Sequence, residues 1–343
     1  MKTNQLILAT LALVALAACT KDNVVNVTTP DNEIGFNAVT QRATKANDAI
    51  ISGATYGTDN TFQLWGWQSE AGDFSEFLDD ASSNFMSNIT ISWCGGPQSR
   101  ANAWRNSEYY YYWPFTGKLS FLAIHPSTVA PTSTGWDEDN DVPQAAINDY
   151  TIDTDPETTN ETVDLMFATN EGTRTSVLAG DGKVGLVFKH ALSQIEVKVK
   201  TNENYSHDVT FDVESVTFHN IDLSGDVTYI NDAIAWTDNT TQTVDWVYYN
   251  TVKEGITNAY QTYGAPKVNI PQPANAETTI TIGYSMTQHE SDKITGTVTI
   301  SKPQLWEAGK KYNYTINFRL NEILFNPSVT DWVDVNVETI TIY

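Results

Sequence analysis

Short segments in which apolar and polar residues alternate recur along most of the chain. A period of two places the apolar side chains on one face of an extended strand, so each segment predicts a β-strand with one buried side. Turn signals such as Gly95-Gly96-Pro97 lie between them, and the pattern predicts an all-β protein built from β-sandwiches. Few segments have a helical pattern, and GDFSEFLDDASSNF, at residues 72–85, is the best helix candidate. The expected strands are TFQLWGW (61–67), NITISWC (88–94), KLSFLAIHP (118–126), VDLMFAT (163–169), KVGLVFKHALSQIEVKVK (183–200), VTFDVESVTFHNIDL (209–223), TTITIGYSM (278–286), KITGTVTI (293–300), KKYNYTINFRL (310–320) and VTDWVDVNVETITIY (329–343).

The length of 343 residues allows two domains of ordinary size. The longest alternating segment could leave one sandwich and enter the next, so we place the border near His190. This gives an N-terminal sandwich at residues 43–190 and a C-terminal sandwich at 191–343. Residues 127–162 are rich in Ser, Thr, Pro and Asp, and we expect long surface loops there.

The first 18 residues have the layout of a secretory signal peptide. Lys2 supplies a positive end, and an apolar run at 6–18 precedes Cys19. The run is too short for a membrane-spanning helix, which needs about 20 apolar residues. LAAC at 16–19 resembles a bacterial lipobox, in which Cys19 would be lipidated, and two or more acyl chains would make the attachment durable. Plain secretion with cleavage after a small-residue site is the alternative.

Charge and cysteine content exclude some partners. The chain has 19 Lys and Arg against 42 Asp and Glu, a formal net charge of −23. Such a surface repels nucleic acid and anionic lipid. If Cys19 is lipidated, Cys94 has no partner for an internal disulfide, and we expect it to be a small buried apolar residue.

No motif in the chain predicts catalysis or metal binding. The five histidines are scattered without zinc-ligand spacing, and we expect no cofactor and no metal. Asp137, Asp139 and Asp141 are spaced like the start of a calcium loop. Val142 stands where that loop needs Gly and Asn148 where it needs an acid, so a solvated acidic loop is the better interpretation.

The segment EIGFNAV, at 33–39, predicts a first strand with Ile34, Phe36 and Ala38 on one side. Arg42 and Lys45 follow it, and no further basic residue occurs before Arg100. An exposed basic pair behind a short strand is a substrate for a trypsin-like protease. Charge alone does not distinguish such a site from an ordinary solvated pair.

Five blocks resemble, in order, those of the fimbrillin family, the type V pilins. The resemblance implies two tandem β-sandwich domains of transthyretin-like or immunoglobulin-like type. It also implies an outer-membrane lipoprotein precursor that a trypsin-like protease cuts behind the first strand. VTQRATKA matches that position, so the expected bond is Arg42-Ala43, with Lys45-Ala46 in reserve, and residues 19–42 would form a lipid-anchored propeptide. The blocks are YYYYWPFTGKLSFLAIHP (109–126), VDLMFAT (163–169), VGLVFKHALSQIEVKV (184–199), EAGKKYNYTINF (307–318) and FNPSVTDWVDV (325–335).

Loss of the first strand would leave an apolar slot that a strand of another subunit can fill. The expected donor is DWVDVNVETITIY, at 331–343. Its side chains change face near Glu338-Thr339, which predicts a bulge or bend there. The alternative is that this segment is only the last strand of its own sandwich. The donor residues are Val333, Val335 and Val337 on one face and Ile340 and Ile342 on the other.

Three functions of different classes follow. The first is a structural pilin that polymerises with itself and with other fimbrial subunits into a cell-surface fimbria for adhesion or biofilm. The second is a tip or anchor adhesin, or a monomeric surface lipoprotein that binds a host glycan or protein receptor. The aromatic run Tyr109 to Trp113 could stack on sugar rings, although such residues usually pack a core. The third is a glycosidase, which needs two facing carboxylates, and nothing in the sequence indicates one.

Overall fold

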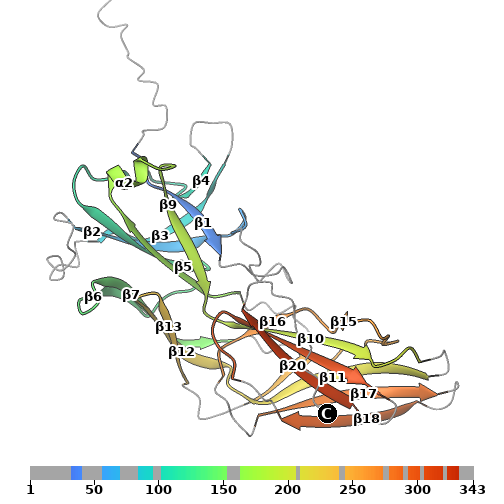
Figure 1. Cartoon of the computed structure of the whole chain (residues 1–343). Helices are drawn as coiled ribbons and strands as arrows, with labels where there is room; N and C mark the ends of the chain where they lie inside the picture. Colours follow the sequence, from blue (N-terminus) through green and yellow to red (C-terminus); the bar gives the residue numbers. More distant parts are fainter. Residues whose placement is uncertain are drawn as a thin grey trace, which may run out of the picture.

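The computed structural model describes residues 32–40, 56–69, 84–95, 102–152, 163–205, 209–238, 244–272, 278–288, 293–301, 305–319 and 323–331. Strands make up most of these residues, as the alternating pattern predicts (Figure 1). In chain order the elements are β1 (Gly35–Thr40), β2 (Phe62–Ser69), β3 (Asn84–Cys94), β4 (Ala103–Arg105), β5 (Lys118–His125), β6 (Ser133–Asp137), β7 (Val142–Thr151), β8 (Met166–Gly172), α2 (Arg174–Leu178), β9 (Lys183–His190), β10 (Ser193–Thr201), β11 (Val209–Ile221), β12 (Ser224–Ile230), β13 (Ala233–Asp238), β14 (Val244–Tyr249), β15 (Gln261–Thr262), β16 (Lys267–Asn269), β17 (Thr279–Gln288), β18 (Ile294–Ser301), β19 (Lys310–Phe318) and β20 (Ile323–Asp331).

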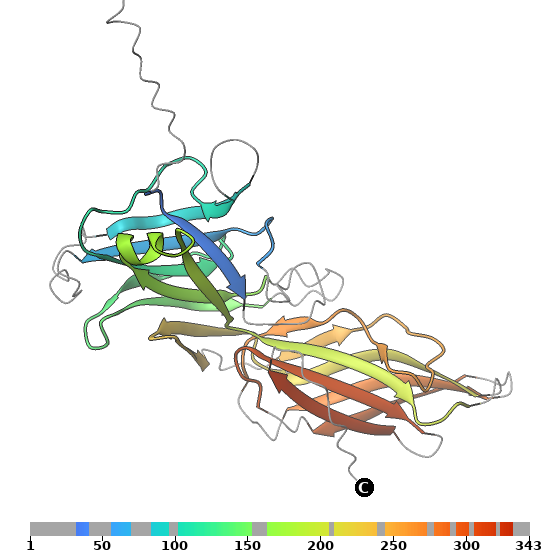
Figure 2. The ribbon, with the colours of Figure 1, turned by 45° about the horizontal axis from the view of Figure 1, so that its top comes forward.

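The N-terminal unit, coloured blue to green in Figure 2, is a closed barrel. Its strand order is β1-β4-β3-β2-β5-β8-β9. Its interior is filled by large apolar side chains that alternate along the strands, because successive side chains of a strand point to opposite faces. Phe62 and Phe121 are completely buried there, and Trp104 is 2% exposed. Closure leaves no free sheet edge in the barrel as long as β1 is present.

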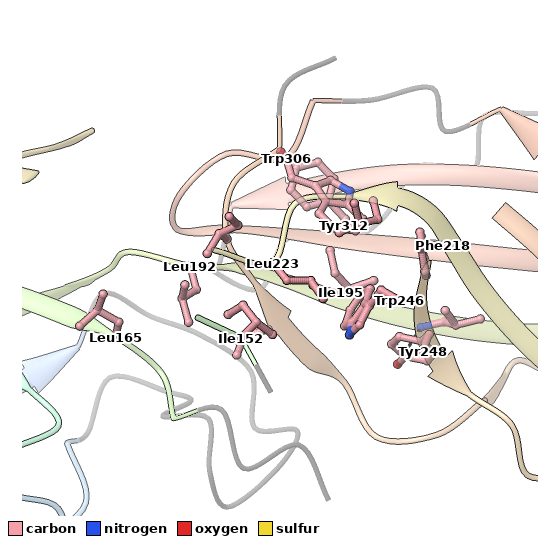
Figure 3. Packing of buried hydrophobic residues seen from close by; sticks show 14 of the residues in the cluster. Ile152, Leu165, Leu192, Ile195, Phe218, Leu223, Trp246, Tyr248, Trp306 and Tyr312 are labelled. Atoms are coloured by element: carbon pink, nitrogen blue, oxygen red, sulfur yellow. Dashed lines mark hydrogen bonds between the residues drawn. The ribbon is translucent and has the colours of Figure 1, made fainter. Parts of the chain in front are cut away.

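The C-terminal unit is a sandwich of two sheets. One contains β15, β10, β19 and β20 in that order, with β16 also paired to β10, and the other has the order β14-β11-β17-β18. An aromatic cluster joins their inner faces, since the ring of Phe218 in β11 lies 5.5 Å from those of Trp306 and Tyr314. Figure 3 shows Phe218 and Trp306 within this cluster. Trp306 donates a 2.7 Å hydrogen bond from Nε1 to the Tyr314 hydroxyl, which satisfies its polar atom inside the core.

A fourth sheet, β13-β12-β7-β6, contains strands from both sides of the expected border near His190. Pairing of β7 with β12 joins residues 144–151 to residues 224–230. The expectation of long surface loops over 127–162 is therefore wrong for β6 and β7. Their inward positions include the small residues Pro143 and Ala145, so the apolar alternation is weak in the sequence.

The expected long strand at 183–200 is divided into β9 and β10 at Ala191 and Leu192. Both residues are completely buried. Strand β9 closes the barrel and β10 enters the C-terminal sandwich, while the exact domain ranges stay a prediction. Most of the helix candidate at 72–85 lies outside the described residues, and its last two residues begin β3. Within the described ranges, no helix has the length and apolar character to cross a membrane.

Candidate functional site

The candidate site is the seam where β1 completes the barrel. All residues of β1 pair in parallel with β9, from Gly35 opposite Lys183 to Thr40 opposite Phe188. On its other side β1 meets β4 antiparallel, with Phe36 opposite Trp104 as the paired position. The ladder to β9 therefore supplies most of the backbone pairing that holds β1.

The inner face of β1 carries the three side chains that the alternation places together. Ile34, Phe36 and Ala38 are 3%, 1% and 8% exposed. The ring of Phe36 meets that of Phe121 edge to face at 5.2 Å and that of Phe62 at 6.4 Å. Since burial of a Phe or Ile side chain stabilises by about 1.5–3 kcal/mol, these side chains contribute substantially to the barrel core.

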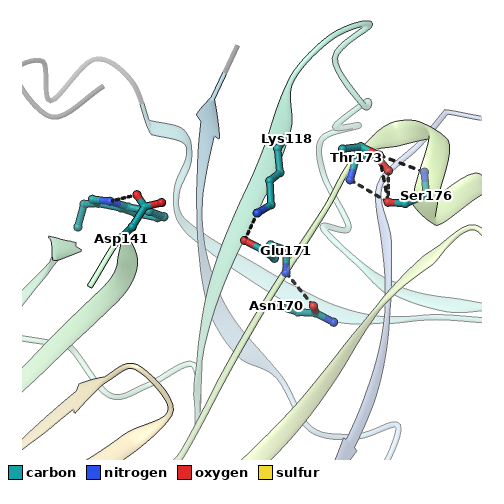
Figure 4. Close-up of polar contacts among 7 residues, drawn as sticks. Lys118, Asp141, Asn170, Glu171, Thr173 and Ser176 are labelled. Carbon is teal, nitrogen blue, oxygen red and sulfur yellow. Dashed lines mark hydrogen bonds and ion pairs between the residues drawn. The ribbon is translucent and has the colours of Figure 1, made fainter. Parts of the chain in front are cut away.

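The segment ahead of β1 is held by a loop and by the start of α2. The Ile34 amide donates to the Tyr111 carbonyl at 2.8 Å, and the Trp113 amide donates to the Asn32 carbonyl at 2.9 Å. Arg174 donates from Nε and Nη2 to Asn32 Oδ1 at 3.0 and 2.7 Å. The Thr173 side chain caps the N-terminus of α2, the helix that carries Arg174, by accepting a hydrogen bond from the Ser176 amide (Figure 4). We call these contacts the N-terminal clamp.

A buried ion pair lies beside the clamp. Arg105 Nη1 is 2.6 Å from Glu33 Oε2, and the two side chains are 6% and 2% exposed. Arg105 Nε has no hydrogen-bond acceptor among the described residues. The guanidinium also covers Gly35, where an added Cβ would lie 3.0 Å from Nη2 and 3.1 Å from Cζ. Sequence reasoning missed this pair, because single charges far apart in the chain leave no periodic signal.

The comparisons identify the family to which this barrel and sandwich belong. A family model described as fimbrillin-like matches residues 26–332. The chain belongs to the fimbrillin-like family. That family is one of fimbrial proteins rather than of enzymes, and it agrees with the resemblance seen in the five sequence blocks.

Solved structures share the fold of this fimbrillin-like chain. A fimbrial protein from Bacteroides vulgatus is similar with a TM-score of 0.61 and 15% identity, over 88% of this chain and 100% of that protein. A candidate cell adhesion protein from Bacteroides ovatus is similar with a TM-score of 0.53 and 16% identity, over 89% and 99% of the two chains. At such identities the likeness establishes a common fold. No curated protein matches the chain by sequence.

The fimbrillin-like chain carries a group of exposed aromatic side chains on residues 109–115, the loop of the N-terminal clamp, which we call the clamp loop. Tyr109, Tyr110, Tyr112 and Phe115 are 63%, 56%, 42% and 89% exposed, while Trp113 is 4% exposed. The expectation that this run packs a core is therefore right for Trp113 and wrong for the exposed tyrosines. The physical reason is that residues 109–115 form a loop whose backbone pairs with residues 32–34, so the side chains do not alternate across a sheet.

Asp137 and Cys94 are two other positions that the sequence singles out. Asp137 accepts hydrogen bonds from the Asp139 amide and the Asn140 side chain in the β6–β7 turn, as expected for a solvated acidic loop. Cys94 is free and partly exposed at the end of β3, so the expectation of a buried thiol is wrong. Among the described residues, no three His, Cys, Asp or Glu side chains gather as metal ligands.

The buried histidines of the barrel are also structural. Burial lowers the pKa of His125 to about 4 and raises the pKa of Tyr56, whose hydroxyl lies 2.6 Å from His125 Nδ1. His190 Nδ1 lies 2.7 Å from Asp164 Oδ2, and both side chains are fully enclosed. Neither His125 nor His190 reaches solvent, so neither is positioned to contact a substrate.

Several predicted positions lie outside the described residues. These include the lipidation site, both cleavage bonds and the donor face. Strand β20 ends at Asp331, which pairs with Lys310 of the same chain. The roles assigned to all these residues stay predictions. The positions are Cys19, Arg42, Ala43, Lys45, Ala46, Val333, Val335, Val337, Ile340 and Ile342.

Proposed function

We propose that the protein is a structural pilin subunit of a surface fimbria, exported as an outer-membrane lipoprotein and polymerised by strand exchange. Membership of the fimbrillin-like family supports a fimbrial subunit. The observation that carries the strand-exchange mechanism is the position of β1. It fills the barrel core, and its last residue, Thr40, lies two positions before Arg42.

Maturation follows from this position. Lipid on Cys19 holds the precursor on the membrane, and a trypsin-like protease cuts Arg42-Ala43, or Lys45-Ala46 in reserve. The cut separates β1 from the rest of the barrel. When β1 leaves with residues 19–42, the β9 edge loses its ladder and the barrel loses three core side chains, so an unpaired edge and an apolar slot become available to another strand.

The C-terminal segment 331–343 of a second subunit fills the slot in this mechanism. The three valine side chains that enter the slot, at ~1.5–3 kcal/mol each, contribute roughly 5–9 kcal/mol. Association and ordering cost about 4–15 kcal/mol. Because these magnitudes are similar, the durability of the fibre rests on slow withdrawal of the inserted strand.

One observation favours a second function, a tip or anchor adhesin that binds a glycan or a protein receptor. The rings of Tyr110 and Tyr112 are exposed and stacked, with 6.4 Å between their centres and 9° between their planes. Exposed aromatic rings are suitable surfaces for sugar stacking. Binding to a glycan array that disappears in a Tyr110→Ala, Tyr112→Ala variant would support this function.

Limited trypsin digestion of a lipid-free precursor, residues 20–343, tests the pilin function. We expect cleavage after Arg42, followed by ladders that resist SDS without heating. A variant with Arg42→Gln and Lys45→Gln should not be cut between β1 and β2 and should stay monomeric, and deletion of 331–343 should prevent ladders while cleavage continues. A trimmed wild-type chain that remains monomeric would contradict the proposed function.

A further inference from the structure

Departure of β1 changes the surroundings of Arg105. In the precursor its guanidinium faces Glu33 at 2.6 Å and covers Gly35. If β1 leaves, Glu33 leaves with it, and a partly enclosed cation remains at the seam. A strand that enters must supply both an apolar face and a negative charge, because an unpaired charge in an enclosed site is costly.

We propose that residues 332–339 of one subunit take the places of residues 33–40 of the next, in the register that sets Asp334 against Arg105. This inference rests on the proposed function and specifies the register of its strand exchange. The two segments read EIGFNAVT (33–40) and WVDVNVET (332–339). In this register Val333, Val335 and Val337 occupy the positions of Ile34, Phe36 and Ala38, respectively. Val335 is smaller than Phe36, and this loss of side-chain volume is partly offset because Val337 is larger than Ala38.

Asp334 then stands at the position of Gly35. A Cβ at that position lies 3.0 Å from Arg105 Nη2, so the carboxylate of Asp334 is placed directly against the guanidinium. The far end of a flexible Arg side chain can move by the few tenths of an ångström that this contact needs. Residues 33 and 35 share one face of the strand, so Asp334 replaces Glu33 from the same side. The unused Nε of Arg105 allows a bidentate ion pair with this carboxylate.

The rest of the register matches the outer face of β1. Asn336 takes the place of Asn37, whose side-chain amide donates to Asp181, so the same amide is retained. Glu338 takes the place of Val39, which is 39% exposed, so this second acid faces solvent.

Other registers lose either the charge match or an apolar insertion. A shift by one residue turns polar side chains into the core. A shift by two residues puts Asp334 in the place of Glu33 and so keeps a carboxylate near Arg105, but it puts the polar Thr339 in the place of Ala38. Insertion of Ile340 and Ile342 on the inner face puts Thr341 opposite Arg105. Of these registers, only the proposed one combines three apolar insertions with a carboxylate at the guanidinium.

Disulfide crosslinking between subunits measures the register directly. In a lipid-free Cys94→Ser precursor, Glu338→Cys and Val187→Cys form the matched pair, because Val39 lies opposite Val187 in the ladder. After trypsin treatment and mild oxidation, we expect ladders that survive boiling in SDS until reductant is added. The control pair Asn336→Cys and Val187→Cys is displaced by two residues, beyond disulfide reach, and should give ladders that heating dissolves. Crosslinking of the control pair instead of the matched pair would overturn the register.

A charge deletion tests the ion pair. Asp334→Asn should slow ladder formation about tenfold, whereas Glu338→Gln in the same segment should leave the rate unchanged. Equal rates for Asp334→Asn and wild type would overturn the role of Asp334 while the pilin function stands. Absence of ladders from the wild-type chain would overturn the proposed function and the register together.

Discussion

At the scale of single residues, the Glu33–Arg105 pair connects the N-terminal segment to the barrel. Both side chains are almost fully enclosed. A buried ion pair adds little compared with an apolar pair of the same shape, but removal of one partner leaves the other charge uncompensated. The charge of Arg105 is therefore compensated only when the strand in the seam supplies a carboxylate.

We expect Glu33→Gln to lower the unfolding free energy of the uncut precursor by about 3 kcal/mol, in the range for loss of one partner of a buried pair. The matched control is Glu171→Gln. Glu171 pairs with Lys118, and their side chains are 53% and 25% exposed, so the change should stay within about 1 kcal/mol. Urea unfolding of the two variants measures the difference, and equal losses would refute the assignment.

The sequence predicts some of these residues and not others. Alternation places Ile34, Phe36 and Ala38 on one face, because period two is a local property of a strand. The partners of Arg105 and Asn32 depend on how distant segments come together. A single charged or amide residue in the sequence does not indicate which distant residue it will contact. The exposed tyrosines were misjudged for the same reason, since their loop is fixed by its backbone contacts with residues 32–34.

At the scale of elements, β1 is held unequally on its two sides. Its ladder to β9 is parallel and covers the whole strand, while one paired position joins it to β4. Parallel pairing is slightly less stable per residue than antiparallel pairing. The buried side chain of Phe36 therefore contributes much of what retains β1 after the chain is cut.

Substitution of Phe36 by Ala should shorten the lag between trypsin cleavage and the first ladders by more than tenfold. Loss of a buried Phe costs about 3–5 kcal/mol, and each 1.4 kcal/mol is a factor of ten in an equilibrium constant. Cleavage is followed by mass spectrometry and ladder growth by unheated SDS gels. Val39→Ala, at an exposed position of the same strand, is the control. An unchanged lag for Phe36→Ala would show that retention of β1 does not limit assembly.

Most strands could be predicted from the sequence, and their partners could not. The strand at 33–39 was expected, but its parallel pairing with β9 depends on closure of the barrel. The hairpin of β6 and β7 was missed because two of its buried positions hold Pro143 and Ala145, which weaken the apolar alternation, and because its turn is strongly polar. The segment 183–200 is divided at two buried apolar residues, where the alternation changes parity, from Val184, Leu186 and Phe188 in β9 to Ile195, Val197 and Val199 in β10.

At the scale of the whole molecule, the outer face of the barrel shares a hydrophobic core with the sandwich, while the barrel interior forms a second cluster. Apolar residues of β2 and β5 on the outside of the barrel belong to the same buried cluster as the aromatic residues of the sandwich. Leu165 and Leu192 lie between the two units (Figure 3), and the sheet of β7 and β12 crosses the expected border. The two units are therefore coupled in stability as well as by the chain.

We expect the uncut precursor to unfold in one cooperative transition. Hydrogen exchange measured through a urea series should show β5 and β17 losing protection at the same midpoint. Leu192→Ala should lower that midpoint for both strands, since loss of a buried Leu costs about 2–5 kcal/mol. Val244→Ala, at a 40% exposed position, should leave the midpoints of both β5 and β17 unchanged. Separate midpoints in the precursor would mean that the shared core does not couple the units.

The N-terminal clamp also gives the seam a direction. One end of β1 is tied to the clamp loop and Arg174, whereas the other end leads to the predicted cut. After the cut, β1 therefore separates from the barrel first at its Thr40 end, and the incoming strand can pair with β9 progressively from that end. Because the seam belongs to the barrel and the proposed donor follows β20 of the sandwich, every joint is heterologous. Subunits joined in this way form a polar filament with two chemically different tips. One tip presents an empty barrel seam, and the other presents an unpaired C-terminal donor segment.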